Sequence, residues 1–336
     1  MRTLFFPPVL RFGHLKQLPE NICQQFARNG YQVYFCNNTL GENTFEEVER
    51  NLFVFHNYEY ALEYVKNKNI KIDVMLTTWA KHYDWVDKIK PKLTIYYSCD
   101  SFNEWKPYEK LMLDKSDMVL CTAEKLQQMR KEEHNNVHLV RNATDSSLFN
   151  KDYKVINEIA NLPGFKFAFV GAIGSWTSTY LMRKVAKKYP VFLVGQEFGK
   201  KCPDNVINLG LKKHEELINY YHSFDAFLLP FNTKLEVVQC ACPVKLYEYM
   251  TIGKPIISTS WAETELFNNY QKIVFTSNSD EEFMENVDYV ANMNQEEKDI
   301  LKEKSRMFMM TNRWEDRYKQ IKNIINDYIE KNNIKL

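Results

Sequence analysis

The sequence predicts an α/β protein of two domains, each built on a mostly parallel sheet flanked by helices. Short runs rich in valine, isoleucine and aromatic residues alternate with helical patterns, and such β-α-β alternation is typical of parallel sheets. The alternation restarts after Asn150. The length of 336 residues exceeds that of a usual single domain, and a hydrophobic content of 45% allows a core in each half.

The first half contains a series of predicted strands with helices between them. The apolar start of the chain carries Arg2 and Arg11 and a proline pair and lacks a small-residue cleavage site. It therefore predicts a first strand and not a secretory signal. Helices are expected at Pro19 to Arg28 and Ala123 to Lys131. The predicted strands are Thr3 to Phe6, Gln32 to Cys36, Ile72 to Thr77, Leu93 to Ser98, Met118 to Cys121 and Val137 to Val140.

The second half repeats this pattern and ends in helices. The polar cluster from Asn142 to Ser147 suits a linker, so we place the boundary near residue 150, between domains 1–150 and 151–336. The last helix, with Ile321 and Ile325 on its apolar face, is expected to pack outside the second sheet. The predicted strands are Lys166 to Val170, Val191 to Val194, Val206 to Leu209, Ala226 to Leu229, Pro255 to Ser258 and Lys272 to Phe275.

Composition excludes several classes of function. Lysine and arginine total 44 against 43 acidic residues, which disfavours a nucleic-acid binder. No uncharged apolar stretch is long enough to span a membrane, so we expect a cytoplasmic protein, with peripheral membrane contact left open. The seven cysteines lack a CxxC pair and are expected to be reduced thiols. A zinc site from Cys202, His214, Cys240 and Cys242 is disfavoured by its weak spacing.

The first segment with chemical meaning is the glycine turn after the strand Lys166 to Val170. It runs through Gly171, Gly174 and Ser175 into a helical pattern at Tyr180 to Lys188. A strand, a glycine turn and a helix start form an anion site, with Ser175 as helix cap or phosphate ligand. The alternative is a plain β-α turn. No GxGxxG occurs, which disfavours an NAD-dependent oxidoreductase.

The second such segment is the predicted helix Val244 to Ile252. Pro243 suits its first turn and Gly253 its C-terminal end. Lys245 and Glu248 lie three positions apart and share a face. One interpretation is an exposed ion pair. In the other, the helix start at Pro243 and Val244 meets a diphosphate together with Lys245, while Glu248 accepts hydrogen bonds from ribose hydroxyls.

The order of motifs GAIGSW, FLVG, NLG-LKKHEEL, YYHSFDAFLLPF and CPVKLYEYMTIGKPIIST resembles the C-terminal domain of glycosyltransferase family 4. The resemblance is to bacterial cell-surface polysaccharide transferases of the teichuronic-acid type. It implies the GT-B fold, in which two Rossmann-like domains face a central cleft, with the acceptor on the first and the nucleotide sugar on the second. By this resemblance Glu248 holds the ribose, Pro243 to Lys245 hold the diphosphate, and the base lies against Gln196 and Lys212.

The family has a further glutamate where this chain has Cys240, which leaves the sugar-contacting acid unassigned, with Glu236 as a nearby candidate. In the first half, the segments around Gly13 and His14 and around Asp100 are similar to the family in the right order. The resemblance implies that Gly13 and His14 face the donor phosphates and the acceptor across the cleft. Asp100 ends a strand, where α/β sites form.

These first-half residues also have plain structural readings, as a turn glycine, a surface histidine and, for Asp100, the cap of a helix near Phe102. Several aromatic residues are candidates for stacking on sugars along the cleft wall, although core packing is the commoner fate of each. They are Trp79, Trp85, Tyr97, Phe102 and Trp105.

The sequence therefore predicts transfer of a sugar from a nucleotide sugar, with UDP as the expected nucleotide, to a glycan, lipid-linked or other hydroxyl acceptor. The resemblance implies retention of configuration and neither metal nor cofactor. If the reaction inverts instead, a base is needed, and His14 and Asp100 are the candidates. Two alternatives remain open at this point. One is a nucleotide-sugar epimerase or hydrolase of the same fold, and the other is a catalytically silent scaffold subunit.

Overall fold

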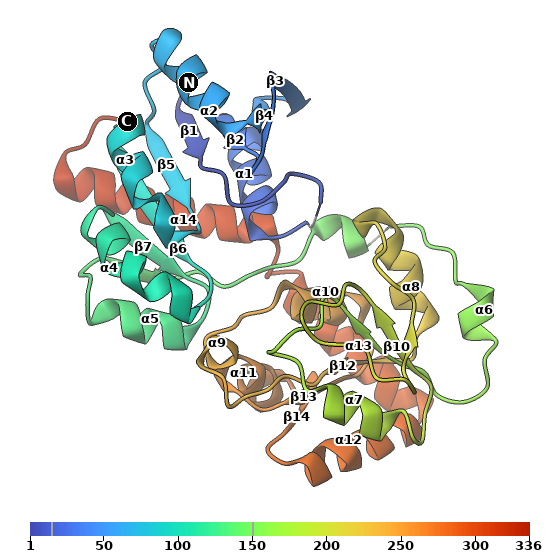
Figure 1. Ribbon diagram of the computed structural model, residues 1–336. Helices are drawn as coiled ribbons and strands as arrows, with labels where there is room; N and C mark the ends of the chain where they lie inside the picture. Colours follow the sequence, from blue (N-terminus) through green and yellow to red (C-terminus); the bar gives the residue numbers. More distant parts are fainter. Residues whose placement is uncertain (15, 150) are drawn as a thin grey trace. The chain divides into compact units, whose positions relative to one another are not determined.

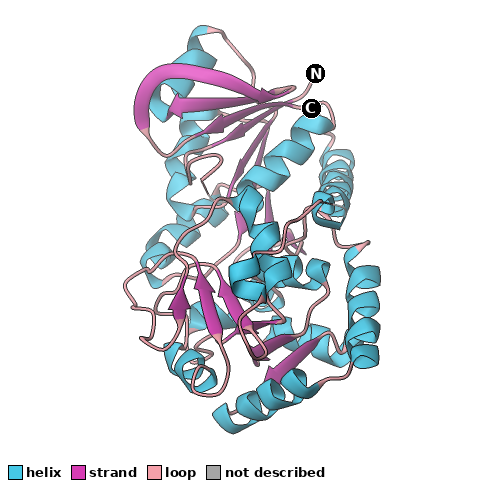
Figure 2. Cartoon of the chain, turned by 90° about the vertical axis from the view of Figure 1, so that its right-hand side faces the viewer, coloured by secondary structure: helices cyan, strands magenta, loops and turns pink. Residues whose placement is uncertain are grey.

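The computed structural model describes residues 1–14, 16–149 and 151–336. The chain divides into two compact units, each formed around one sheet (Figure 1). Unit 1 contains residues 1–142, 240–242 and 314–336, and unit 2 contains residues 143–239 and 243–313. In both units helices lie on either side of the strands (Figure 2). The predicted two-sheet α/β architecture is confirmed, although the first boundary follows residue 142 and not residue 150.

The sheet of unit 1 has the strand order β3-β4-β2-β1-β5-β6-β7-β8. All neighbours are parallel except β3 and β4. Every strand predicted in this half is present, with ends that differ by two residues at most. The bounds are β1 Thr3–Phe6, β2 Gln32–Cys36, β3 Leu40–Glu49, β4 Leu52–Asn57, β5 Val74–Thr77, β6 Leu93–Ser98, β7 Met118–Cys121 and β8 Val137–Leu139.

Two strands of this sheet, β3 and β4, were not predicted. β3 carries acidic residues and is exposed along almost its whole length, so it lacks the alternation of buried and exposed positions that marks a half-buried strand. β4 pairs in parallel with β2 and contributes Phe55 to the core around Phe5, Tyr34 and Trp85. The charged edge and the irregular register of β3 against β4 are typical of protected sheet edges.

The last helix belongs to unit 1, so the prediction that it packs outside the second sheet is wrong. Tyr318 of α14 packs edge-on against Phe26 of α1, with ring centroids 5.1 Å apart. Gln320 donates a hydrogen bond to the carbonyl of Leu139, at 2.8 Å. The apolar stripe of α14 is as predicted, but its partner is α1. The helices of this unit are α1 Leu18–Arg28, α2 Tyr58–Asn67, α3 Tyr83–Ile89, α4 Lys106–Asp114, α5 Glu124–Lys131 and α14 Trp314–Asn332, with 3-10 turns η1 Ala80–His82 and η2 Asn103–Trp105.

The sheet of unit 2 is parallel throughout, in the order β11-β10-β9-β12-β13-β14. Its strands are β9 Phe167–Val170, β10 Val191–Val194, β11 Ile207–Asn208, β12 Ala226–Leu229, β13 Ile256–Thr259 and β14 Val274–Ser277. The helices are α6 Asn157–Ala160, α7 Thr179–Val185, α8 Leu217–Ser223, α9 Glu236–Gln239, α10 Val244–Ile252, α11 Ala262–Gln271, α12 Asp280–Asn292 and α13 Gln295–Met309, with 3-10 turns η3 Ser146–Phe149 and η4 His214–Glu216.

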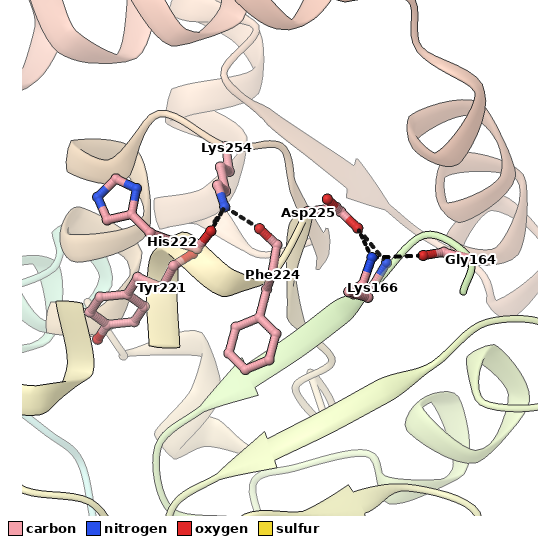
Figure 3. A network of polar contacts seen from close by, with 7 residues as sticks. All are labelled: Gly164, Lys166, Tyr221, His222, Phe224, Asp225 and Lys254. Carbon is pink, nitrogen blue, oxygen red and sulfur yellow. Dashed lines mark hydrogen bonds and ion pairs between the residues drawn. The ribbon is translucent and has the colours of Figure 1, made fainter. Parts of the chain in front are cut away.

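A polar network holds the amino ends of β9, β12 and β13 (Figure 3). The Lys254 ammonium donates to the carbonyls of Tyr221, His222 and Phe224, which are the last acceptors of α8. Burial lowers the pKa of Lys254 to about 8. Beside it, the backbone N–H of Lys166 donates to Asp225 at 2.8 Å. This edge lies opposite to the strand ends that lead into the candidate site, so the network is structural.

Replacing Lys254 by methionine is expected to destabilise unit 2 by about 1–3 kcal/mol, because the carbonyls at the end of α8 lose their donor. Denaturant unfolding followed by circular dichroism measures the loss. The exposed Lys187 of the same unit, changed to methionine, is the control and should stay within about 0.5 kcal/mol of the wild type. Equal stability of the two variants would contradict a capping role.

The structure also bears on the predicted thiols, metal sites and membrane-spanning helices. All seven cysteines are free thiols, as predicted, and five of them are buried. Among the described residues, no group of three or more histidines, cysteines or acidic residues is placed to hold a metal ion. None of the helices in the described part of the chain is long and apolar enough to cross a membrane.

Candidate functional site

Helix α10 has the predicted bounds, Val244–Ile252, and the residues that flank it explain why it begins and ends there. Pro243 precedes it in an extended conformation with ψ of 131°, and Gly253 ends it in the left-handed region with φ of 76°. The N–H groups of Val244 and Lys245 have no hydrogen-bond partner among the described residues. The first turn of a helix leaves such donors open, and their dipoles favour an anion.

Tyr249 anchors α10 to the end of β9. Its hydroxyl accepts a hydrogen bond from the N–H of Val170 at 2.7 Å and donates to the carbonyl of the same residue at 3.2 Å. Its ring stacks on Phe227 of β12, with centroids 4.1 Å apart. The last residue of β9 is therefore fixed to the helix, and the glycine loop that follows starts from a rigid point.

The Lys245 ammonium lies between aromatic rings and against the glycine loop. Its Nζ is 4.4 Å from the ring centroid of Phe169 and 5.5 Å from that of Phe231. A Cβ at Gly171 would stand 2.3 Å from this Nζ, so the ammonium would have to move if residue 171 had a side chain. Burial lowers the pKa of Lys245 to about 8, with Glu248 acting in the opposite direction. No carboxylate within the described residues forms an ion pair with it.

Glu248 is buried on the same helix, and a tyrosine binds one of its two oxygens. The Tyr221 hydroxyl donates to Oε2 at 2.8 Å, while Oε1 accepts no hydrogen bond from the residues that the structure describes. Burial, with the nearby Glu248 charge, raises the pKa of Tyr221 well above its usual value, so Tyr221 stays a donor. The predicted alternative of an exposed Lys245–Glu248 ion pair is wrong, because Glu248 is only 9% exposed and no ion pair joins the two.

The loop after β9 runs from Gly171 to Ser178 and differs from its prediction. Helix α7 begins at Thr179, and Ser178 caps it by accepting from the N–H of Leu181. Ser175, predicted as the cap, is exposed in the loop. The glycine turn therefore does not lead directly into a helix start. The indole of Trp176 covers the Cα of Gly174, where a Cβ would come within 2.5 Å of the ring.

The loops after β9 and β10 are joined to each other. The N–H of Ile173 donates to the carbonyl of Gln196 at 2.9 Å, and the N–H of Phe198 donates to the carbonyl of Ile173 at 2.7 Å. The Gln196 side chain is exposed. Lys212, after β11, is half-buried with its ammonium 5.6 Å from the Tyr220 ring centroid. Both residues thus follow strand ends at the same edge of the sheet as Gly171, and their contact with a base stays a prediction.

In unit 1 the loop after β1 carries Gly13 and His14. Gly13 has φ of 79°, and its N–H donates to a carboxylate oxygen of Glu20 at 3.0 Å. Burial raises the pKa of Glu20 to about 7, against the effects of the Gly13 N–H and Lys16. His14 is exposed, and its N–H donates to the carbonyl of Arg11. The contact of Glu20 with Gly13 was not predicted, because a glutamate in the first turn of a helix is ordinarily a surface residue.

Asp100 lies two residues beyond β6, at the carboxyl edge of the sheet. Burial raises the pKa of its carboxyl to about 6. The alternative role as a helix cap is wrong, since Phe102 precedes the turn η2 and Trp105 precedes α4. Such a pKa suits a group that exchanges protons near neutral pH, and a catalytic role for Asp100 stays a prediction.

The five aromatic candidates divide into two groups. Tyr97 is fully buried and Trp85 is 7% exposed, so both belong to the core of unit 1. Trp79, Phe102 and Trp105 are half-buried at the ends of β5 and β6. Where the family has its earlier glutamate, this chain has Cys240. That cysteine is fully buried, with its sulfur 3.8 Å from that of Met129. Glu236 is exposed on α9.

Solved structures with the same architecture are glycosyltransferases of the GT-B fold. Sucrose-phosphate synthase from Thermosynechococcus elongatus is 14% identical, with a TM-score of 0.75 over 98% of this chain and 100% of that one. Anabaena HepE in complex with UDP-glucose is 11% identical, with a TM-score of 0.70 over 97% and 100%. An E. coli trehalose-6-phosphate structure bound with UDP-2-fluoro glucose is 9% identical, with a TM-score of 0.71 over 98% and 99%. At these identities the likeness shows the fold alone.

The sequence itself identifies the family. A family model described as glycosyl transferase-like matches residues 153–323, which is more than half of the chain. No curated protein sequence matches it. The chain belongs to the glycosyl transferase-like family and is a glycosyltransferase. The finer resemblance to family 4 and to teichuronic-acid transferases stays a prediction.

Proposed function

We propose that this glycosyltransferase uses a UDP-sugar as donor, binds it on unit 2, and transfers the sugar with retention and without a metal ion to a hydroxyl of a glycan or lipid-linked acceptor. The observation that carries the proposal is the Lys245 ammonium, on a half-buried side chain, which has no ion-pair partner among the described residues and lies against Gly171. A cation in that position is costly unless it binds an anion. The structures with UDP-glucose and UDP-2-fluoro glucose support the choice of nucleotide.

The groups on α10 match the parts of a nucleoside diphosphate. The diphosphate meets Lys245 and the open N–H groups of Val244 and Lys245, and these donors stabilise the charge on the leaving group as the glycosidic bond breaks. Glu248, three positions further on and therefore nearly one turn away, accepts hydrogen bonds from the ribose hydroxyls through its free oxygen. In a retaining reaction the acceptor attacks on the face of the leaving group and passes its proton to the departing phosphate.

The proposal is tested by incubating the protein with UDP-, GDP- and TDP-sugars and acceptor mixtures, with and without a chelator. We expect a UDP-sugar to be consumed in an acceptor-dependent reaction that the chelator leaves unchanged, and NMR of the product to show a retained anomeric configuration. Loss of turnover with chelator would disprove the metal-free mechanism. Donor consumption without acceptor would favour an epimerase or hydrolase, and absence of nucleotide binding would disprove the donor site.

Replacing Glu248 by alanine is expected to weaken UDP binding by roughly tenfold to a hundredfold, the effect of losing hydrogen bonds to a charged acceptor. Isothermal titration calorimetry with UDP measures it. The exposed Glu236, changed to alanine, is the control. A weaker affinity for UDP in Glu248→Ala, with the wild-type affinity kept in Glu236→Ala, would fit the ribose role. An unchanged affinity in Glu248→Ala would contradict it.

The affinity for UDP is expected to fall above pH 8. The pKa of Lys245 in the free protein is about 8, and a bound diphosphate raises it, so binding takes up a proton above that pH. The dissociation constant should therefore rise by only about twofold from pH 7 to 8, and above pH 9 its rise should approach roughly tenfold per pH unit. Titrations between pH 7 and 9.5 measure this slope. A flat profile would mean that the ammonium does not contact the nucleotide.

A further inference from the structure

A set of half-buried rings lies in unit 1, around Lys81. The Lys81 Nζ is 5.1 Å from the ring centroid of Trp79 and 5.3 Å from that of Tyr108. Tyr108 in turn stacks on Tyr83, with centroids 6.3 Å apart and an interplanar angle of 22°. We call these four residues, Trp79, Lys81, Tyr83 and Tyr108, the aromatic-lysine surface.

This surface begins at the carboxyl edge of the sheet. Trp79 lies two residues beyond the end of β5, and Asp100 lies two residues beyond the end of β6. The two strands are parallel neighbours, with Thr77 opposite Tyr96, so both residues emerge at the same edge. Ligand sites of parallel α/β sheets form at this edge. From there the surface continues onto α3 and α4 through Tyr83 and Tyr108.

Lys81 differs from the other lysines that lie over rings in this unit. Lys88 lies over Trp85 and pairs with Asp84 at 2.6 Å. Lys115 lies over Tyr83 and pairs with Asp87. In the described part of the chain Lys81 has no such carboxylate and no hydrogen-bond partner. The Trp79 indole Nε1 is also buried without a partner. A buried N–H without a partner calls for a ligand or another specific explanation.

The chemistry of the surface matches a charged carbohydrate. Half-buried aromatic faces bind the C–H faces of sugar rings, and a lysine between them supplies the positive charge that a carboxylate or phosphate substituent requires. We propose that the aromatic-lysine surface binds the acceptor, and that the acceptor is an anionic glycan whose acidic group meets Lys81. The inference deepens the proposed function and rests on it, since it names the acceptor class of the same reaction.

A glycan array with neutral, uronic-acid and phosphorylated oligosaccharides tests the proposal on the full-length chain. We expect the acidic glycans to bind and their neutral counterparts not to bind, and the two acidic arms distinguish a carboxylate from a phosphate. For the best-bound glycan, calorimetry should show affinity roughly tenfold lower in Lys81→Gln and in Tyr108→Ala. Lys88→Gln, the matched variant in which an ion-paired lysine over a ring is changed, should bind as the wild type does.

Three outcomes would overturn the proposal. They are binding to neutral glycans alone, no binding to any acidic glycan, and equal affinity in Lys81→Gln and the wild type. Loss of binding to phosphatidylglycerol vesicles in Lys81→Gln, without a change in glycan binding, would assign the surface to membranes instead. UDP binding to unit 2 serves as the separate readout, and the wild type and all three variants should bind UDP equally. Failure of UDP binding throughout would count against the proposed donor site and not against this surface.

Discussion

Changing Lys245 to methionine will nearly abolish sugar transfer while leaving the protein at least as stable as the wild type. The ammonium lies against Gly171, and its surroundings oppose the charge, because desolvation lowers its pKa. Methionine has a similar length and makes favourable contacts with rings such as Phe169 and Phe231. The fold therefore gains from the change, while the leaving diphosphate loses its cation, at a cost of about 10²–10³ in turnover.

Thermal unfolding and steady-state kinetics on the same samples measure the two effects. Lys184, which lies over the Tyr180 ring in the same unit, provides the matched control, and Lys184→Met should retain full activity. The pH dependence of UDP affinity above pH 8 should also disappear in Lys245→Met. If the variant loses activity only because it unfolds, or keeps its activity, the assignment of Lys245 to the diphosphate is wrong.

Changing Arg130 to methionine will cause the largest loss of stability in unit 1. Its guanidinium lies 2.8 Å from a carboxylate oxygen of Glu109, and both side chains are almost fully buried. Arg130 also donates to the hydroxyl of Ser98, at 3.2 Å, and Tyr96 donates to Glu109 at 2.9 Å. Removing one member of a buried pair leaves the other charge unpaired, which costs about 3–5 kcal/mol. The melting temperature of unit 1 should fall by roughly 10 °C.

The pH dependence separates this mechanism from simple loss of packing. Burial already raises the pKa of Glu109 in the wild type, against the effect of Arg130. Removing the arginine raises this pKa further, so the folded variant binds more protons and its stability deficit shrinks as the pH falls. A second change, Glu109→Gln, should restore part of the loss. Arg28→Met removes an arginine from a solvent-exposed pair with Glu49 and should cost less than about 1 kcal/mol. A deficit that is the same at pH 5 and pH 8 would contradict the explanation.

The parts of the fold that could be predicted are those set by local sequence. Buried strands such as β2 and β10 are short apolar runs, and α10 is bounded by Pro243 and Gly253, so their limits follow from residues within them. β3 could not be predicted, because its exposed, acidic residues are placed by pairing with β4. The partner of α14 could not be predicted either, since an apolar stripe shows that a helix packs but not against what.

In the candidate site too, features set by local sequence could be predicted and those set by distant residues could not. Lys245 and Glu248 were identified from their spacing on one helix, and the structure buries Glu248 and half-buries Lys245. The residues that give them their properties come from distant parts of the chain. Phe169 and Phe231 surround the lysine, and Tyr221 binds the glutamate, but no local pattern marks them. Ser175 was predicted as a helix cap or a phosphate ligand, whereas Ser178 caps α7, because helix starts predicted from sequence are uncertain by a few residues.

The packing of α14 on α1 has a consequence for how the protein is made. Synthesis proceeds from the N-terminus at about 5–20 residues per second, so the 142 residues that begin unit 1 leave the ribosome well before α14 exists. The intervening residues of unit 2 take roughly 10–35 s at that rate. During this interval Phe26 lacks the ring of Tyr318 that covers it in the finished protein. The unit that begins the chain is therefore the last to close, because it needs a helix that is synthesised after all of unit 2.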